Sequence, residues 1–311
     1  MGASHVITVV GESLLDLVAQ ADGRCFTAFP GGSPANVAVG LARLGTPVRF
    51  ATQLADDLPG RLVARHLHDS GVAVDLLPAT AKGTSLALVA LDAHGAASYD
   101  FRISWEITRA PDLEPGCRHL HTGSIAAALP PGGDVLDDML ATQRRRGKVT
   151  ISLDPNIRPA LVGPREPARE RVARQVRRSD VVKVSSEDLS WLYPGEHFTE
   201  VAARWLASGP ALVVVTLGGD GGYGLSRTAE VTRPAARVPV VDTVGAGDAF
   251  TAGLLDGLRR ADLLGGDRRD RLASVDADAL ANVLDFAIRV ASLTCARPGA
   301  DPPTRAELAQ S

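Results

Sequence analysis

Short apolar runs recur along the chain, and segments with a helical pattern lie between them. The runs are rich in valine, do not alternate with polar residues, and end near Gly, Pro, Asp or Ser; they cover residues 5–10, 149–153, 181–184 and 211–217. Strands of this kind are buried on both faces, which is typical of a parallel sheet covered by helices on both sides. The pattern therefore predicts an α/β fold with a doubly wound, mostly parallel sheet.

The helical segments alternate with these runs over the whole chain. The segment at 33–44 begins with Ser33 and has Pro34 in its first turn, where the missing N–H of proline costs nothing. The other segments with a helical pattern are 58–70, 134–146, 167–178, 201–207, 246–260 and 277–296. Because the alternation continues throughout, we expect residues 1–311 to form a single domain.

Two segments depart from this alternation. Residues 84–101 contain two β-like runs around the turn sequence Asp92-Ala93-His94-Gly95, which predicts a hairpin, and residues 14–29 show a strand-turn-strand pattern around 21–23. We expect the two pieces to assemble into a small sheet that serves as a lid. Leu86, Leu88 and Ala90 alternate along one run, so they share a face that needs cover from the bound substrate or from a second subunit.

Composition excludes several classes of protein. Hydrophobic residues make up 45% of the chain and charged residues 22%, which excludes a disordered protein. No apolar run reaches the roughly 18 residues that cross a bilayer, and the N-terminus lacks the basic-then-apolar pattern of a signal peptide. The net charge of −3 gives no field that favours nucleic acid or an anionic membrane surface. We therefore expect a cytoplasmic protein that binds neither nucleic acid nor membranes.

Lysine is scarce in this sequence. The chain contains only Lys82, Lys148 and Lys183, and none of them follows glycine in a GK[ST] sequence. A P-loop is therefore excluded. We expect any nucleotide phosphate to be held by backbone amides and arginine instead of a P-loop lysine.

The most specific motif is DTVGAGDAFTAG, which begins at Asp242. Residues 237–241 predict a strand that enters it, and a helix follows it. Gly245, Ala246 and Gly247 place consecutive N–H groups at the start of that helix, where the helix dipole also favours an anion. Asp248 follows in the first turn, where a carboxylate can accept a proton from an attacking hydroxyl while the amides stabilise a transferring phosphoryl group. An ordinary helix start, where Asp is also favoured, is the alternative interpretation.

A second glycine pair precedes the helix predicted at 33–44. Gly31 and Gly32 lead into it, and Asn36 lies in its first turns. An asparagine amide offers both a donor and an acceptor, which suits neighbouring sugar hydroxyls. Asp16 follows the first strand and is a natural acceptor for two hydroxyls. Alone, each of these positions is also compatible with an ordinary turn or helix residue.

These two motifs, GGSPANVA and DTVGAGDAFTAG, resemble the signatures of the ribokinase-like (PfkB-type) carbohydrate kinases. The resemblance covers nearly the whole chain. It includes DPNIR at 154–158, which is similar to the DxNxR segment of fructokinase-like members, TLGGDG at 216–221, and RPGA at 297–300. It implies a ribokinase-like fold, with ATP as the phosphoryl donor and a small sugar as the acceptor.

The activity that the resemblance implies is phosphorylation of a sugar's primary hydroxyl, most closely that of a fructokinase. A 2-keto-3-deoxygluconate kinase, another PfkB-type sugar or nucleoside kinase, and a non-catalytic sugar-binding regulator on the same scaffold are the alternatives. An NAD-dependent oxidoreductase fits poorly, because no GxGxxG sequence follows the first predicted strand.

The resemblance also implies a role for individual residues. Asp248 becomes the general base, with Gly245, Ala246 and Gly247 as the anion hole. The positions implied to contact the sugar are Asp16, Gly31, Gly32 and Asn36, and those implied to border ATP are Ser185, Thr216, Gly218, Gly221 and Gly247. Asp242 and the carbonyl of Val244 match positions that bind a monovalent cation such as K+ in some members. Related kinases often pair their lids, which implies a homodimer joined through them.

Two arginines complete the predicted substrate site. In a chain with so few lysines, arginine is expected to neutralise a phosphate or an acidic sugar, because its planar fork binds oxyanions bidentately. Arg102 follows the predicted lid hairpin and Arg158 ends the DPNIR segment. We therefore add Arg102 and Arg158 to the expected substrate-binding residues.

Two positions depart from the family pattern. Ala55 stands where a GDD-like element usually has glycine, which is expected to alter a tight turn. The sequence Ser185-Ser186-Glu187-Asp188 stands where many members carry NxxE beside the nucleotide and Mg2+. Since Mg2+ is usually held partly through water, we expect Asp188 to position it, with Glu187 as the alternative.

Overall fold

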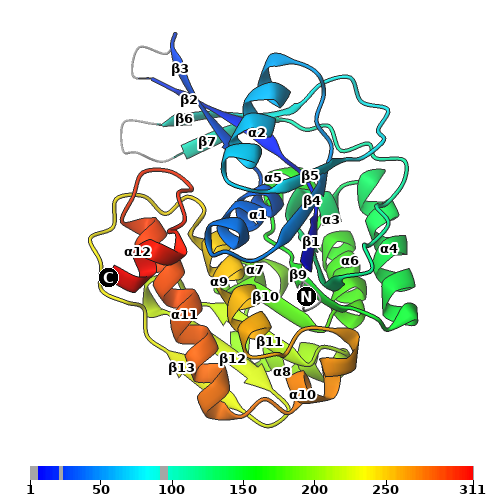
Figure 1. Ribbon diagram of the computed structural model, residues 1–311, viewed down its shortest axis with the longest axis vertical. Helices are drawn as coiled ribbons and strands as arrows, with labels where there is room; N and C mark the ends of the chain where they lie inside the picture. Colours follow the sequence, from blue (N-terminus) through cyan, green and yellow to red (C-terminus); the bar gives the residue numbers. More distant parts are fainter. Residues whose placement is uncertain (1–5, 21–23, 92–96, 311) are drawn as a thin grey trace.

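The computed structural model describes residues 6–20, 24–91 and 97–310. It contains two sheets (Figure 1). The large sheet has nine strands in the order β13-β12-β11-β10-β9-β8-β1-β4-β5, and the small sheet has four in the order β3-β2-β6-β7. The predicted α/β fold with a small additional sheet is confirmed.

The large sheet is parallel except at one edge. Its strands are β1 (Val6–Val10), β4 (Val48–Thr52), β5 (Ala73–Leu76), β8 (Cys117–Gly123), β9 (Thr150–Asp154), β10 (Val181–Ser185), β11 (Leu212–Thr216), β12 (Gly222–Ser226) and β13 (Glu230–Arg233). Only β12 and β13 run antiparallel to their neighbours. The four valine-rich runs lie in β1, β9, β10 and β11, whose side chains are almost all buried.

Helices cover both faces of the large sheet, as the sequence pattern predicts. One face packs against α1 (Ser33–Arg43), α2 (Leu58–Asp69), α9 (Ala246–Arg260) and α11 (Ala277–Cys295). The other face packs against α4 (Gly132–Arg146), α6 (Arg165–Arg178), α7 (Ser186–Leu192) and α8 (Phe198–Ser208). The shorter helices are α3 (Ser124–Ala128), α5 (Pro159–Val162), α10 (Arg269–Ala273) and α12 (Arg305–Gln310). Within the described ranges, no helix has the length and apolar character that a membrane span requires.

The small sheet is built from two segments that are distant in sequence. Its strands are β2 (Leu14–Ala19), β3 (Phe26–Gly31), β6 (Ser85–Leu91) and β7 (Ala97–Arg102), and the central pair β2 and β6 is parallel. The turn residues predicted at 21–23 and 92–95 lie outside the described residues. In Figure 1 this sheet extends away from the large sheet, towards the upper left of the view.

The two faces of the small sheet have different surroundings. The face that carries Asp16 and Ala87 packs at its base against Ile125 of α3. The opposite face carries Leu15 and Leu86, which pack against the core of the large sheet. The protein's own core therefore partly covers Leu86, while for Leu88 and Ala90 of the same face the need for cover from substrate or a second subunit stays a prediction.

One predicted strand does not form. Residues 237–241 are an irregular and mostly exposed connection rather than a strand. Pro239 lies in the middle of this run, and proline has no N–H to donate to a neighbouring strand. Val241 is held instead by a hydrogen bond from its N–H to the carbonyl of Cys295 at 2.8 Å.

Candidate active site

The carboxyl ends of the parallel strands meet along one edge of the large sheet, which is where open α/β sheets bind their ligands. Asp154 is the last residue of β9 and Ser185 the last residue of β10. Ser185 lies beside Thr216, the last residue of β11, in the parallel register. The first turns of α1 and α9 meet at the same edge. Residues from five elements are thus brought together.

Asp248 is the residue on which α1 and α9 converge. It lies in the first turn of α9 and is 8% exposed. Its Oδ1 accepts a hydrogen bond from Ser33 Oγ at 2.6 Å, and its Oδ2 accepts one from Asn36 Nδ2 at 2.8 Å. Burial raises the pKa of Asp248 above its ordinary value, and the two hydrogen bonds oppose that rise. The carboxylate is therefore held in place and made more basic, as a proton acceptor requires.

Ser33 is absent from the sequence-based site. The available signal was its position directly after Gly32 in the GGSPANVA segment, where it could have been taken only as a helix-start residue. Its hydroxyl instead donates to a carboxylate on another helix. Asn36 was expected to contact a sugar, and the structure directs its amide N–H to Asp248.

The start of α9 offers open backbone donors. Gly245 caps the helix with a φ of 74°, a left-handed conformation that favours glycine. The N–H of Ala246 is bonded to the carbonyl of Thr243, and the N–H of Ala249 to the carbonyl of Gly245. The N–H groups of Gly247 and Asp248 have no hydrogen-bond acceptor in the described part of the chain. Of the predicted anion hole, Gly245 and Gly247 thus keep open N–H donors within the described residues, Ala246 does not, and Asp248 adds a donor that the prediction did not include.

A buried ion pair lies beside this helix start. Lys183 Nζ is 2.8 Å from Asp154 Oδ2, and the two side chains are 7% and 1% exposed. Thr251 Oγ1 also donates to Asp154 Oδ2, at 3.3 Å. A Cβ atom placed on Gly247 would lie 3.2 Å from Lys183 Nζ. Although no P-loop exists, a lysine ammonium therefore does lie against the predicted anion site.

Lys183 stays charged in this environment. Burial disfavours the charged form, but the carboxylates of Asp154, Asp248 and Asp188 together raise the pKa of Lys183 above its ordinary value. Nothing in the sequence pattern marks Lys183 as a site residue, because it lies inside an apolar strand run. The fold alone brings it beside Gly247.

The small sheet brings Asp16 to the same region. A Cβ on Gly31 would lie 2.3 Å from Asp16 Oδ2, so a side chain at Gly31 would force this carboxylate to move. Gly32 has a φ of 103° and lies against the carbonyl of Glu12. Burial raises the pKa of Asp16 to about 6, an effect that Arg158 opposes and Asp248 increases. Asp16, Arg158 and Asp248 are thus electrostatically coupled.

The two predicted arginines are placed differently. Arg158 has its Nη1 at 2.7 Å from Asn156 Oδ1, and its charge acts on the nearby Asp16. Arg102 forms an exposed ion pair with Asp100 at 3.0 Å. The register of the small sheet puts Arg102 on the face opposite to Asp16. The structure therefore brings Arg158, but not Arg102, to the predicted substrate site.

Glu12 is a further buried carboxyl group at the end of β1 that the sequence analysis did not select. It is 1% exposed, its Oε2 accepts the N–H of Ala126 at 2.9 Å, and its Oε1 has no hydrogen-bond partner within the described residues. Burial raises the pKa of Glu12 to about 7. The hydrogen bond to Ala126 therefore ties the segment after β1 to α3.

The residues predicted to border a nucleotide lie at the ends of β10 and β11. Ser185 caps α7 and accepts the N–H of Asp188 at 2.9 Å. Asp188 in turn accepts the N–H of Ile157 at 2.9 Å, while Glu187 is exposed. Gly218 and Gly221 flank the turn after β11 with φ values of 57° and 108°, which glycine adopts readily.

Asp242 connects the loop before α9 to the C-terminal loop. Its Oδ1 accepts the N–H of Val244 at 3.0 Å, and its Oδ2 accepts the N–H of Gly299 at 2.8 Å. A Cβ on Gly245 would lie 2.5 Å from the Cβ of Ala300. The RPGA segment is therefore held directly against the start of α9.

Ala55, where the family pattern has glycine, causes no strain. It does not have a positive φ, so alanine fits its backbone conformation. Asp57 caps α2 by accepting the N–H of Gly60 at 2.8 Å, and its other oxygen accepts the N–H of Thr84 at 2.9 Å. This carboxylate thereby joins α2 to the residue that precedes β6.

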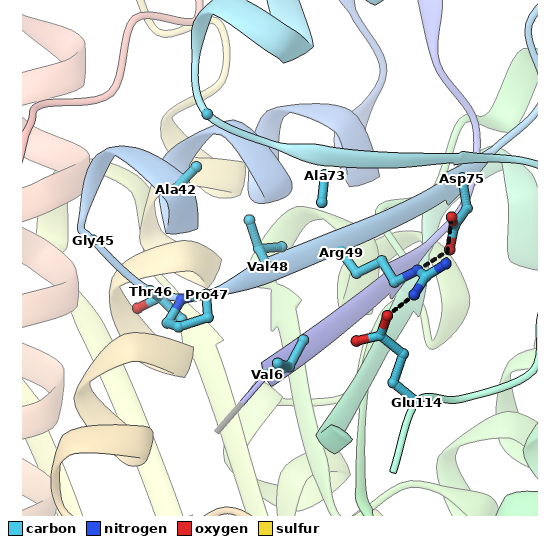
Figure 2. A pocket seen from close by; sticks show the side chains of 11 residues that line it. Val6, Ala42, Gly45, Thr46, Pro47, Val48, Arg49, Ala73, Asp75 and Glu114 are labelled. Carbon is cyan, nitrogen blue, oxygen red and sulfur yellow. Dashed lines mark hydrogen bonds and ion pairs between the residues drawn. The ribbon is translucent and has the colours of Figure 1, made fainter. Parts of the chain in front are cut away.

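A separate cavity lies at the amino ends of β1 and β4, away from this site. It has a volume of about 600 Å³, and its lining includes Gly45. Figure 2 shows Arg49 directed at both Asp75 and Glu114 there. Because these charges are already paired with one another and no predicted site residue lines it, this cavity is not the candidate site.

Comparison with known proteins places this geometry among sugar kinases. Residues 4–307 match the pfkB family carbohydrate kinases. A fructokinase from Rhizobium leguminosarum bv. trifolii is 38% identical over 287 residues, which cover 89% of this chain and 86% of that protein. The structure of a fructokinase with bound ATP from Xylella fastidiosa has a TM-score of 0.87 at 29% identity, covering 99% of this chain and 98% of that one. A fructokinase double mutant from Vibrio cholerae O395, in a fructose-, ADP- and potassium-bound form, has a TM-score of 0.80 at 26% identity, covering 99% and 98%.

Proposed function

The chain belongs to the pfkB family of carbohydrate kinases, and we propose that it transfers the γ-phosphoryl group of ATP to a primary hydroxyl of fructose. Family membership gives the enzyme class, an ATP-dependent carbohydrate kinase. The observation that carries the proposed chemistry is the buried Asp248, held by Ser33 and Asn36 beside the open N–H groups of α9. Such an arrangement suits proton removal from a hydroxyl next to a phosphate.

In the proposed reaction, a hydroxyl oxygen of the sugar attacks the γ-phosphorus of ATP in line with the departing ADP. Asp248 accepts the hydroxyl proton as the new O–P bond forms and the bond to ADP breaks. The N–H groups of Gly247 and Asp248 stabilise the negative charge on the transferred group. Asp248 afterwards releases the proton to water.

The proposed sugar site uses Asp16, Gly31, Gly32, Asn36 and Arg158. Its support is the closeness of Asp16 to Gly31 and the electrostatic coupling of Asp16 with Arg158 and Asp248. Arg102 is left out because of its position on the other face of the small sheet. We propose that the small sheet acts as a lid that excludes water, which would otherwise compete for the phosphoryl group.

The proposed ATP site lies across the ends of β10 and β11. Its contacts are Ser185, Thr216, Gly218 and Gly221, with Gly247 at the phosphates. The support is that Ser185 and Thr216 are neighbours in the sheet and that the RPGA loop packs against the start of α9. A cytoplasmic location, where ATP is available, belongs to the same proposal.

Mg2+ and K+ are the proposed metal ions. Among the described residues, no cluster of three or more His, Cys, Asp or Glu side chains could hold a metal. Mg2+ needs only one or two carboxylates when phosphates and water complete its shell, so a site at Asp188, with Glu187 as the alternative, fits an ion that arrives with ATP. The ion supplies charge neutralisation of the phosphates. For K+, the donors proposed are Asp242 and the Val244 carbonyl.

A homodimer joined through the small sheet completes the proposal. Phe26 and Phe29 of its edge strand β3 are 47% and 45% exposed, and an open edge strand is a site for pairing with another chain. Light scattering over a concentration series tests this. We expect a dimer for the wild type and a shift towards monomer in Leu88→Asp; a wild type that stays monomeric at tens of micromolar contradicts the dimer.

A coupled assay of ATP consumption against an acceptor panel tests the activity. The panel contains fructose, other ketoses, aldoses, 2-keto-3-deoxygluconate and nucleosides. We expect the highest kcat/KM with fructose. A higher value for 2-keto-3-deoxygluconate or a nucleoside contradicts the proposed acceptor. If the protein binds sugar but phosphorylates none of the acceptors, the proposed kinase activity is contradicted and a non-catalytic regulator is supported.

A further inference from the structure

We propose that Lys183 binds the terminal phosphate of ATP together with the N–H groups of Gly247 and Asp248. The inference deepens the proposed function, because it assigns a further phosphate-binding residue to the same site. It gives this chain a lysine at the transferred group although its sequence has no P-loop.

The ammonium of Lys183 lies close to the start of α9. Lys183 projects from β10, while Gly247 opens α9, and Nζ lies 3.2 Å from the point where a Cβ of Gly247 would be. The ammonium therefore lies in close contact with the side-chain position of Gly247. A phosphate that accepts the N–H of Gly247 lies within reach of Lys183 Nζ. A side chain at Gly247 would press on the ammonium, whereas the backbone there does not call for glycine, since Gly247, unlike Gly245, does not have a positive φ.

The ammonium of Lys183 also has N–H donors that no group of the protein uses within the described residues. A lysine ammonium has three N–H donors. Within the described ranges, the hydrogen bond of Nζ is the one to Asp154 at 2.8 Å. The single O–H of Thr251 lies within hydrogen-bond distance of two acceptors, the same Asp154 oxygen at 3.3 Å and the carbonyl of Gly247 at 3.0 Å. Asp154 and Thr251 thus fix Lys183 relative to the start of α9 and leave ammonium donors for a ligand.

The charges around Lys183 also favour a phosphate ligand. Three carboxylates, Asp154, Asp188 and Asp248, act on Lys183, which is their shared cation. Without it, a triphosphate would approach three negative groups. One fixed positive charge at the helix start lowers this repulsion, and it acts most strongly on the phosphate nearest to it.

A purely structural ion pair that joins β9 to β10 is the competing explanation. It predicts a loss of stability in Lys183 variants, with equal effects on ADP and ATP binding. A phosphate ligand predicts an unequal effect, because ADP lacks the terminal phosphate. The ratio of the two affinities therefore separates the explanations.

The experiment measures binding of Mg2+ADP and of Mg2+ with a β,γ-imido ATP analogue by calorimetric titration, together with kcat for fructose. In Lys183→Met we expect the analogue affinity to fall at least about tenfold, ADP affinity to change less than about threefold, and kcat to fall roughly a hundredfold. Lys183→Arg keeps the charge and should recover part of the analogue affinity. Lys148→Met is the matched control at an exposed lysine and should leave all three values unchanged.

Two further variants keep the test decisive. If Lys183→Met does not fold, Lys183→Met with Asp154→Asn removes both buried charges and should still lose analogue affinity selectively. A Cβ at Gly247 pushes on the ammonium, so Gly247→Ala should lower analogue affinity in the wild type by several-fold more than in the Lys183→Met background. Equal losses in both backgrounds contradict the assigned contact.

The failures of the two proposals are distinguishable. A wild type that phosphorylates no sugar contradicts the proposed function, while the ratio of analogue to ADP affinity still tests Lys183. The converse result is an active wild type together with folded Lys183 variants that keep the wild-type ratio of analogue to ADP affinity. That result overturns the inference about Lys183 and leaves the proposed function in place.

Discussion

Two helices of this protein begin after glycine-rich turns, and the two turns contribute different groups to the site. At the start of α1, the side chains of Ser33 and Asn36 donate to Asp248. At the start of α9, the open backbone N–H groups of Gly247 and Asp248 are available to an anion. One helix start thus positions the proposed base, and the other carries that base and the proposed phosphate donors.

The glycines of the two turns are needed for different reasons. Gly32 and Gly245 have φ values of 103° and 74°, so the backbone itself requires glycine there. Gly31 and Gly247 instead lie next to charged side chains: a Cβ at Gly31 would come within 2.3 Å of Asp16 Oδ2 and one at Gly247 within 3.2 Å of Lys183 Nζ, so a side chain at either position would displace the charged group. Similar glycine pairs in a sequence can therefore report a backbone conformation at one position and an approaching charged group at the next.

The largest expected effect on kcat comes from replacing the proposed base itself, rather than the side chains that hydrogen-bond to it. Asp248→Asn keeps the shape of the side chain but removes the proton acceptor, so kcat should fall roughly 10²- to 10⁴-fold. Binding of ATP and fructose, measured by calorimetric titration, should persist. A variant that retains more than about a third of the wild-type kcat contradicts the role of Asp248 as the base.

The next effect tests the backbone requirement at α1. In Gly32→Ala the new residue must adopt a φ of 103° against the carbonyl of Glu12, so the free energy of unfolding should fall by about 1–3 kcal/mol. Chemical denaturation measures this. Gly83→Ala is the matched control, since Gly83 has open space and no positive φ. If the two variants are equally stable, the backbone conformation at Gly32 does not require glycine.

A smaller effect concerns the donors of α1. The hydrogen bonds from Ser33 and Asn36 lower the pKa of Asp248, so Ser33→Ala and Asn36→Ala should each raise it. Because the proposed base works in its deprotonated form, the acid limb of the kcat profile should move to higher pH. The double variant should lose up to about tenfold in kcat on that limb. An acid limb that stays in place in both single variants contradicts the arrangement.

The smallest effect concerns the sugar side of the site. Since the pKa of Asp16 is raised to about 6, the charged fraction of Asp16 falls about fourfold between about pH 7.5 and about pH 5.5. A charged carboxylate is the stronger acceptor for hydroxyls, so KM for fructose should rise by about this factor as pH falls. KM for ATP should change less. Asp16→Asn should remove this pH dependence while raising KM at every pH.

The sequence predicted both helix starts because their signals are local. Glycines and a small polar residue lie within a few positions of each other at both helices, and α1 also has Pro34 in its first turn. The helices and buried strands were predicted for the same reason. The run at 237–241 failed as a strand because Pro239 outweighed its valines.

The parts of the site that depend on long-range packing could not be predicted. Ser33 meets a carboxylate 215 positions away, and Lys183 is hidden within an apolar strand. The side of the small sheet on which Arg102 lies depends on strand register, which a one-residue change would reverse. The sequence thus indicates which residues carry chemistry, while the packing of α1 against α9 decides which of them face each other.

Single-turnover phosphoryl transfer tests the central claim most directly. Enzyme in excess over ATP is mixed with saturating fructose and Mg2+, and fructose phosphate and free phosphate are separated and quantified over time, for the wild type and for Asp248→Asn. The account predicts that the wild type converts nearly all ATP to fructose phosphate, and that the variant, with both substrates bound, does so at least about a hundredfold more slowly. Transfer at the wild-type rate by Asp248→Asn, or release of free phosphate as the main wild-type product, would contradict it.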